Sequence, residues 1–411
     1  MKSTVFVLLI FLSIFEVVAE GDGFSAKDAA AAIEKELQDV ENQNVSLVTQ
    51  LVMFLEYEVP ETRISAAWGL GQLGLEAEEA VPSLVKALKD PDESVRYSVA
   101  ESLGQIGSKD AVSALVEALN DDDSLVRLIS AEALGQIGSK EAVPALVRTL
   151  QNQGNDESVR YRAAEALGKI GSKEAVPSLI KALKDPVDYV RYRSASALGQ
   201  MGVEEAVLPL VKTLQDSDVE MRGLVAEALG RIGSKEAVLP LIRSLRDLDN
   251  YVRRSATWSL GQIGAEEAVL PLMKLLQDQD SRVLINAIES LVSLGAKDCT
   301  GSLITLLQGQ DGEPSVRSRS AQALGQLRVK DAVPALVGGL ENHDENLPLR
   351  IHMAWSLGKI GTPKAIEAAE KFLPELIQSL NDEDPELRVS AKETLKSIGT
   401  PTAMQAIKEP E

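Results

Sequence analysis

Residues 121–146 carry the sequence DDDSLVRLISAEALGQIGSKEAVPAL, and variants of this stretch recur through most of the chain. Their shared core is Val-Arg, then small residues, then Leu-Gly-x-Ile-Gly. The arginine returns at Arg63, Arg96, Arg127, Arg160, Arg191, Arg222, Arg253, Arg317, Arg350 and Arg388, and Leu284 stands at this position in an eleventh copy. Most steps are 31 or 33 residues, and the last step contains a longer insertion around residues 362–372. Such a fixed period is typical of a repeat protein.

Each copy predicts two helices. In residues 140–150, apolar side chains recur at the i, i+3 and i+4 spacing of a helix with one buried stripe. The second helix is expected over residues 94–106 and their equivalents, where small residues allow neighbouring helices to approach closely. Gly107 follows this helix as a candidate C-terminal cap, and Ser108 is placed to cap the next helix. The same pair recurs at Gly138-Ser139, Gly171-Ser172 and Gly233-Ser234.

One helix pair cannot bury its own apolar stripe, whereas stacked pairs bury it against their neighbours. We therefore expect an all-α fold, a right-handed α-solenoid of about eleven helix pairs over residues 44–399. An amphipathic stretch predicts a capping helix in residues 24–42, and residues 400–411 form a short C-terminal tail.

The motif Asp-x-x-x-x-Val-Arg-x-x-Ala-x-x-Ala-Leu-Gly-x-Ile-Gly-x-x-x-Ala-Val-x-x-Leu, matched with few departures by residues 121–146, resembles the HEAT-repeat superfamily, specifically its phycobilisome-lyase HEAT-like type. That resemblance implies a helical solenoid, and a family that contains bilin lyase subunits, a hydroxylase and non-catalytic binding scaffolds. Deoxyhypusine hydroxylase, the metal-dependent member, uses paired His-Glu dipeptides for iron. Here Asp344 follows His343 and Met353 follows His352, so this activity is not expected.

The N-terminus is typical of an export signal. Lys2 precedes an apolar run over residues 5–15, and Ala19 offers a small residue for cleavage before Glu20. Residues 1–19 are thus predicted to be a signal peptide and the protein to be exported, periplasmic or extracellular. The alternative is an uncleaved segment that anchors the chain to a membrane.

Composition argues against several functions. A net charge of −20 and a pI near 4.7 disfavour nucleic acid as a partner. Two histidines and one cysteine are too few for an imidazole- or thiolate-based metal centre, and no nucleophile-elbow sequence occurs. We read His343 and His352 as surface residues and Cys299 as a small buried residue. We therefore expect no enzyme activity, no cofactor and no metal.

The repeating arginine has a structural explanation. An aspartate precedes it by six residues in many copies, at Asp90, Asp121, Asp185, Asp216, Asp247, Asp278 and Asp382. We expect each arginine to pair with an aspartate of its own or an adjacent turn, which would form a ladder along the stack. Leu284 interrupts this ladder, and Arg282 or a local bend is a candidate for compensation.

The large polar aromatic residues share a few positions of the second helices. Trp68, Trp258 and Trp355 lie five residues after the arginine position; Tyr97, Tyr161 and Tyr192 lie one residue after it; Tyr189 and Tyr251 lie two residues before it. Basic residues occur at nearby positions, namely Arg162, Lys169, Arg193, Arg231, Arg254, Arg319 and Lys359. The resemblance places second helices on the concave surface of the solenoid. Because aromatic residues and arginine dominate interface hot spots, these positions predict a partner-binding groove that is locally basic.

The predicted function is a non-catalytic scaffold that binds a protein or peptide on this groove. The predicted contact residues are Trp68, Tyr97, Tyr161, Arg162, Tyr189, Tyr192, Arg193, Tyr251, Arg254, Trp258 and Trp355. One alternative is a bilin lyase-like subunit that handles a chromophore. A family-related oxidoreductase is disfavoured because the His-Glu motif is missing, and a structural role in a larger assembly stays open.

Overall fold

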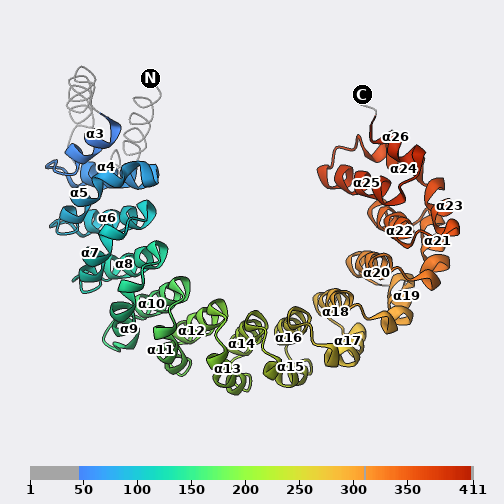
Figure 1. Ribbon diagram of the computed structural model, residues 1–411, viewed down its shortest axis with the longest axis horizontal. Coiled ribbons are helices and arrows are strands. Elements are labelled where there is room, and N and C mark those ends of the chain that lie inside the picture. Colours follow the sequence, from blue (N-terminus) through green and yellow to red (C-terminus); the bar gives the residue numbers. More distant parts are fainter. Residues whose placement is uncertain (1–45, 310–311, 409–411) are drawn as a thin grey trace. The chain divides into compact units, whose positions relative to one another are not determined.

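A computed structural model describes residues 46–309 and 312–408 of the 411-residue chain. The predicted signal peptide and N-terminal capping helix lie outside the described residues. The described chain contains helices and no strands, which confirms the all-α prediction (Figure 1). It divides into two compact units, one ending at Ala206 and one beginning at Val207. None of the described helices is long and apolar enough to cross a membrane.

Eleven helix pairs occupy the described residues, as the repeat predicts. The first helices of the pairs are α3 (Leu47–Phe54), α5 (Val81–Ala87), α7 (Val112–Ala118), α9 (Val143–Gln151), α11 (Val176–Ala182), α13 (Val207–Thr213), α15 (Val238–Ser244), α17 (Val269–Lys274), α19 (Thr300–Gln308), α21 (Val333–Glu341) and α24 (Leu373–Ser379). The second helices are α4 (Pro60–Leu73), α6 (Glu93–Ile106), α8 (Ser124–Ile137), α10 (Glu157–Ile170), α12 (Asp188–Met201), α14 (Val219–Ile232), α16 (Asn250–Ile263), α18 (Ser281–Ser293), α20 (Pro314–Gln326), α22 (Leu347–Ile360) and α25 (Pro385–Ile398).

Two helices fall outside this pairing. The insertion around residues 362–372 forms α23 (Pro363–Lys371), and the predicted C-terminal tail contains α26 (Pro401–Ala406). Ala403 of α26 is fully buried, so this part of the tail packs against the last pair. Most first helices begin with a short 3-10 segment, such as Lys140–Ala142 before α9.

Within each unit, consecutive second helices pack against one another and form the inner row, while the first helices form the outer row (Figure 1). The close approach of the second helices depends on the first glycine of the Leu-Gly-x-Ile-Gly phrase. A Cβ at Gly104 would lie 2.8 Å from the Ala133 Cα, and a Cβ at Gly230 would lie 2.8 Å from the Ser259 Cα. No side chain fits in either space, so glycine at this position sets the spacing of the row.

The second glycine of the phrase ends the helix. Gly107 adopts φ 75°, in the left-handed region, and Gly138, Gly171 and Gly233 do the same. The hydroxyl of Ser108 then accepts a hydrogen bond from the Asp110 amide, and Ser139 and Ser234 cap in the same way. Ser172 is an exception, because its side chain makes no capping hydrogen bond.

The arginine ladder is present within each unit, where most of the repeating arginines link their helix pair to the next one. Arg96 donates from Nε and Nη2 to both carboxylate oxygens of Asp121, at 2.9 and 2.8 Å, and from Nη1 to the carbonyl of Asp90 at 2.9 Å. Arg96 thus links its own turn to the following one, and Arg63, Arg222 and Arg253 make the same set of contacts. The Arg–Asp rungs within the units are Arg63–Asp90, Arg96–Asp121, Arg127–Asp156, Arg160–Asp185, Arg222–Asp247 and Arg253–Asp278.

The ladder changes after α18. Arg317 and Arg350 use the glutamates Glu345 and Glu375 instead of aspartates. The Asp382 carboxylate forms no rung with Arg350: the α23 insertion precedes this pair, and Glu375 of α24 accepts from Arg350 in its place. Asp382 instead contacts the arginine of its own pair, because its backbone carbonyl accepts from Arg388 at 2.6 Å. Arg282 does not compensate for Leu284, because its side chain is exposed and takes part in no ion pair among the described residues.

The rung aspartates have low pKa values. Burial alone would raise the pKa of each carboxyl group, but the arginine hydrogen bond and backbone N–H groups outweigh it and lower the pKa. This holds for Asp121, Asp185, Asp247 and Asp278. The ladder therefore stabilises the charged form of these groups in the folded state.

Candidate partner-binding surface on the second helices

All eleven predicted contact residues lie on second helices. Trp68 is on α4, Tyr97 on α6, and α10 carries Tyr161 and Arg162; α12 carries Tyr189, Tyr192 and Arg193; α16 carries Tyr251, Arg254 and Trp258; and Trp355 is on α22. Every one of these side chains is exposed or half-buried. The structure does not gather them into one site: it forms one cluster in the first unit and two neighbouring features in the second.

In the first unit, three tyrosines form a cluster on α10 and α12. The rings of Tyr161 and Tyr189 lie 6.0 Å apart between centroids, and those of Tyr189 and Tyr192 lie 5.9 Å apart, the latter edge to face. Tyr189 is 60% exposed, so the cluster presents aromatic surface to solvent. These distances are in the favourable range for aromatic pairs, which holds the rings in place before any partner arrives.

Ion pairs surround the tyrosine cluster. Arg162 lies over the Tyr161 ring at 5.7 Å and donates to Glu165 at 3.0 Å. Lys169 also pairs with Glu165 at 3.0 Å, and Arg193 approaches the same carboxylate at 3.9 Å. Burial would raise the pKa of Glu165, but these cations lower it. The expectation of a locally basic groove therefore needs correction: the basic side chains share carboxylates and form a mixed-charge surface.

In the second unit, Tyr251 of α16 packs on Gly223 of α14. A Cβ at Gly223 would clash with the ring, so glycine at this position makes room for the tyrosine. The Tyr251 hydroxyl donates to Glu227 at 3.4 Å, and Ser255 donates to the same carboxylate at 3.0 Å. Burial and the nearby glutamates raise the pKa of Tyr251 to about 12. Arg254 covers the ring at 5.4 Å, so Tyr251 is held by a neighbour on each side.

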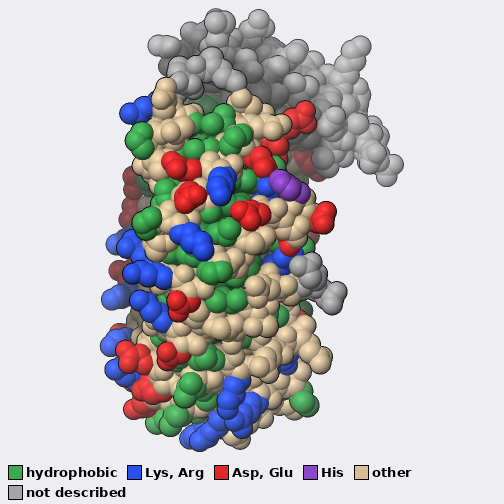
Figure 2. All heavy atoms as spheres, turned by 90° about the vertical axis from the view of Figure 1, so that its right-hand side faces the viewer, with side chains coloured by type: hydrophobic (Ala, Val, Ile, Leu, Met, Phe, Trp, Pro, Cys, Tyr) green, Lys and Arg blue, Asp and Glu red, His purple; other side chains and the backbone are tan. Residues whose placement is uncertain are grey.

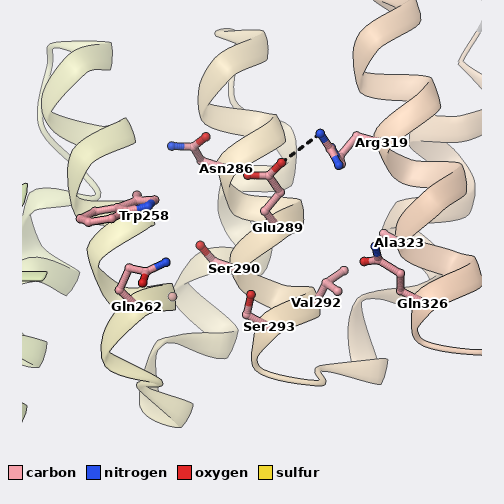
Figure 3. A pocket seen from close by; sticks show the side chains of 11 residues that line it. Trp258, Gln262, Asn286, Glu289, Ser290, Val292, Ser293, Arg319, Ala323 and Gln326 are labelled. Atoms are coloured by element: carbon pink, nitrogen blue, oxygen red, sulfur yellow. Dashed lines mark ion pairs between the residues drawn. The ribbon is translucent and has the colours of Figure 1, made fainter. Parts of the chain in front are cut away.

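Next to it, Trp258 forms one wall of a cavity of about 300 Å³ between α16, α18 and α20 (Figure 3). Asn286 and Glu289 of α18 lie opposite the indole, and Arg319 of α20 pairs with Glu289 at 3.1 Å. The amide side chains of Gln262 and Gln326 complete the rim. This cavity combines an aromatic face with several hydrogen-bonding groups, as small binding sites commonly do.

The remaining predicted residues stand apart from these clusters. Trp68 is 40% exposed near the start of the described chain. Tyr97 on α6 has a pKa raised by burial and by the carboxylates of Glu101 and Glu132. Trp355 on α22 is covered by Lys359 at 5.2 Å. Each offers an isolated aromatic side chain, not a cluster.

Sequence reasoning missed the glutamates of this surface. Glu132, Glu165, Glu227 and Glu289 lie five residues after the arginine position, which is the offset of the three tryptophans. The same offset could therefore have revealed them. Figure 2 shows a different face, the right-hand side of Figure 1, on which acidic, basic and hydrophobic side chains are also interspersed.

The single cysteine and the two histidines lie in surroundings that do not form a catalytic or metal site among the described residues. Cys299 is fully buried, its thiol donates to the Ala296 carbonyl, and burial raises its pKa to about 11. His343 is exposed, as expected. His352 is half-buried instead, with Nδ1 lacking a hydrogen-bond partner and a pKa lowered by burial and by Arg319. Among the described residues, no three His, Cys, Asp or Glu side chains are grouped to hold a metal ion.

Comparison with solved structures places the chain among helical solenoids. A structure of Kap95p with RanGDP is 16% identical, with a TM-score of 0.61 over 96% of this chain and 61% of that chain, so this chain spans about three fifths of Kap95p. The CpcE–CpcF phycocyanin lyase from Nostoc sp. is 25% identical with a TM-score of 0.37, over 61% of this chain and 95% of that one. Human deoxyhypusine hydroxylase is 24% identical with a TM-score of 0.30, over 65% and 99%.

No curated protein sequence matches the chain. A family model described as HEAT repeats matches residues 48–135, 117–198, 176–261, 238–313 and 300–375. These matches cover most of the chain and follow the helix pairs described above. The chain therefore belongs to the HEAT-repeat family.

Proposed function

We propose that this protein is a non-catalytic scaffold that binds a protein or peptide partner along its second helices. The observation that carries the proposal is the placement of all three tryptophans and five of the six tyrosines on the solvent-facing side of these helices. A second helix needs only its small and aliphatic residues to pack the row. Large aromatic residues on the other side expose apolar surface without adding to that packing.

The tyrosine cluster has the properties of an interface hot spot. Tyr161, Tyr189 and Tyr192 support one another, so they lose little conformational entropy on binding. The ion pairs around Glu165 form a polar rim that hydrogen-bonds to a partner while it excludes water. A peptide crossing this cluster would bury the exposed Tyr189 ring and exchange some of the rim's water contacts.

The Trp258 cavity supplies a second anchor. Its volume suits one large side chain, which would stack on the indole. Asn286, Gln262 and Gln326 offer both donors and acceptors, which match the N–H and C=O groups of an extended peptide. The Glu289–Arg319 pair accommodates a polar group of either charge at the edge.

Binding to a partner isolated from the native source would test the proposal by titration calorimetry. Tyr192→Ala and Trp258→Ala should each weaken binding by about 10-fold or more, with helicity unchanged, because each removes a central aromatic contact. Tyr57→Ala provides the matched control, since Tyr57 is the one tyrosine outside the second helices. Unchanged affinity in the Tyr192→Ala, Trp258→Ala double variant would overturn the assignment of the surface.

We further propose that the protein is exported after cleavage before Glu20, on the basis of Lys2 and the apolar run over residues 5–15. The intact mass of the protein from its native source decides between cleavage and retention as an anchor. The bilin lyase alternative makes a different prediction: purified protein mixed with a bilin and an acceptor protein would yield a covalent adduct. The scaffold proposal predicts none.

A further inference from the structure

A row of exposed leucines runs across three consecutive first helices of the second unit. Leu208, Leu239 and Leu270 are 61%, 64% and 69% exposed, and each is the second residue of its helix, in α13, α15 and α17. The core packing of these helices comes from neighbouring buried residues, namely Val207, Leu210, Val238, Leu241 and Leu272. The exposed leucines are thus not required by the fold.

This row is specific to these three helices. The other first helices from α5 onward carry Pro82, Ser113, Pro144, Pro177, Gly301, Pro334 and Pro374 at the same position. Three residues further along, the half-exposed Val211, Ile242 and Met273 widen the apolar row. Three adjacent repeats therefore share an exposed apolar surface that the other repeats lack.

Charged residues border the leucine row on both sides. Lys212, Arg243 and Lys274 lie four residues after the leucines, are exposed, and take part in no ion pair among residues 46–309 and 312–408. Glu236 and Glu267 lie three residues before Leu239 and Leu270 and are also exposed. Residues three and four apart share a helix face, so the surface reads acid, leucine, base through Glu236, Leu239 and Arg243 and again through Glu267, Leu270 and Lys274, with each glutamate in the 3-10 segment before its helix. Lys235, next to Glu236, is also exposed.

That order makes the surface complementary to itself. A two-fold axis along the leucine row would set leucine on leucine, Arg243 opposite Glu236 of the partner subunit, and Lys274 opposite Glu267 of the partner subunit. We propose that α13, α15 and α17 form a homodimer interface with a second copy of this chain. An isologous contact requires this kind of self-complementary patch, and an unrelated partner would need to reproduce the same order of charges.

The interface is small. Neighbouring helices lie about 8–10 Å apart, so three helices of about two turns each offer well under about 800 Å² per subunit. Two chains of net charge −20 also repel each other at long range. The dimer is therefore weak, with a dissociation constant on the order of 10 µM.

Sedimentation equilibrium of the purified full-length protein, from about 1 to about 200 µM, tests this inference. The wild-type protein should convert from monomer to dimer over this range, and Leu239→Glu should raise the dissociation constant at least about 10-fold. Glutamate suits the first turn of a helix, so the variant should keep its fold. Leu248→Glu is the control, because Leu248 is fully exposed in a turn away from the row.

A charge-reversal pair tests the geometry. Arg243→Glu and Glu236→Arg should each be monomeric alone, because each places like charges opposite one another, whereas an equimolar mixture should form a heterodimer. A wild-type protein that stays monomeric throughout would overturn the proposal. A dimer that the Leu239→Glu substitution leaves intact would also overturn it, as would charge-reversed variants that do not form a heterodimer when mixed. If the leucine row binds a different protein and the chain does not self-associate, the row is an interface for that protein and not for a second copy.

Discussion

Replacing one arginine of the ladder tests whether it holds adjacent pairs together, and Arg253 is the most informative choice. Its Nε and Nη2 atoms donate to Asp278 at 2.8 and 2.9 Å, and Nη1 donates to the carbonyls of Asp247 and Leu248, both at 3.0 Å. The arginine and aspartate side chains are only 16% and 8% exposed. Arg253→Leu therefore removes four hydrogen bonds and leaves a mostly buried carboxylate with only backbone donors.

Breaking a buried ion pair lowers the free energy of unfolding by about 3–5 kcal/mol. Because Arg253 is partly exposed, the expected loss here is about 3 kcal/mol. For a unit of about 200 residues, this free energy corresponds to a melting temperature lower by about 6–12 °C. Differential scanning calorimetry and urea unfolding measure the two quantities.

Arg282→Leu is the matched control, because Arg282 is an exposed arginine on the next second helix and forms no ion pair among the described residues. It should change stability by less than about 0.5 kcal/mol. Arg253→Leu with Asp278→Leu should recover part of the loss, since an apolar pair leaves no unpaired charge. Equal stability of Arg253→Leu and Arg282→Leu would refute the ladder as a source of cohesion.

Three further predictions follow from the same structure. Because the folded pKa of the rung aspartates lies below the unfolded value of about 3.9, their contribution to stability is complete above that pH. This contribution is lost as the pH falls through the folded pKa. The urea concentration at the unfolding midpoint should therefore be constant from about pH 5 to 7 and should decrease at pH values below about 4, with a smaller decrease in Arg253→Leu. Equal decreases in the wild-type protein and in Arg253→Leu would contradict this prediction. Gly230→Val should lower the free energy of unfolding of the second unit by about 3 kcal/mol or more, measured by urea unfolding, because the valine side chain would meet the backbone of Ser259. A urea midpoint equal to that of the wild-type protein would mean that the helices can move apart. Cys299 should react with a thiol reagent only after unfolding, and rapid reaction in the native protein would show that its site opens.

The fold follows from the sequence because nearly every determinant is local. The glycine and serine punctuation sets helix ends within a few residues, and a repeat contacts only its neighbours. Where the period changes, this reasoning fails. The pairing of Arg350 with Glu375 and not Asp382 depends on how α23 enters the array, which no residue count reveals.

Periodicity predicts the helix side on which the candidate contact residues are exposed, but it does not predict the charge of that surface. Periodicity alone predicts that Tyr161 and Trp258 each lie on the exposed side of their own second helix. The pairing of Arg162 and Arg193 with Glu165, by contrast, depends on side chains from two helices. The leucine row was missed for a related reason. An apolar residue in an amphipathic helix is expected to be buried. Only the structure shows that Leu239 is exposed and does not contribute to the core.

Site-specific photo-crosslinking tests directly whether a partner lies on the second helices. Benzoylphenylalanine would replace Tyr192 on α12 or Trp258 on α16, and, as a control, the exposed Lys181 on the outer helix α11. After irradiation in an extract of the native source, the two second-helix positions should yield the same partner adduct, and position 181 should yield none. An adduct formed at position 181, with none at the other two, would contradict this prediction.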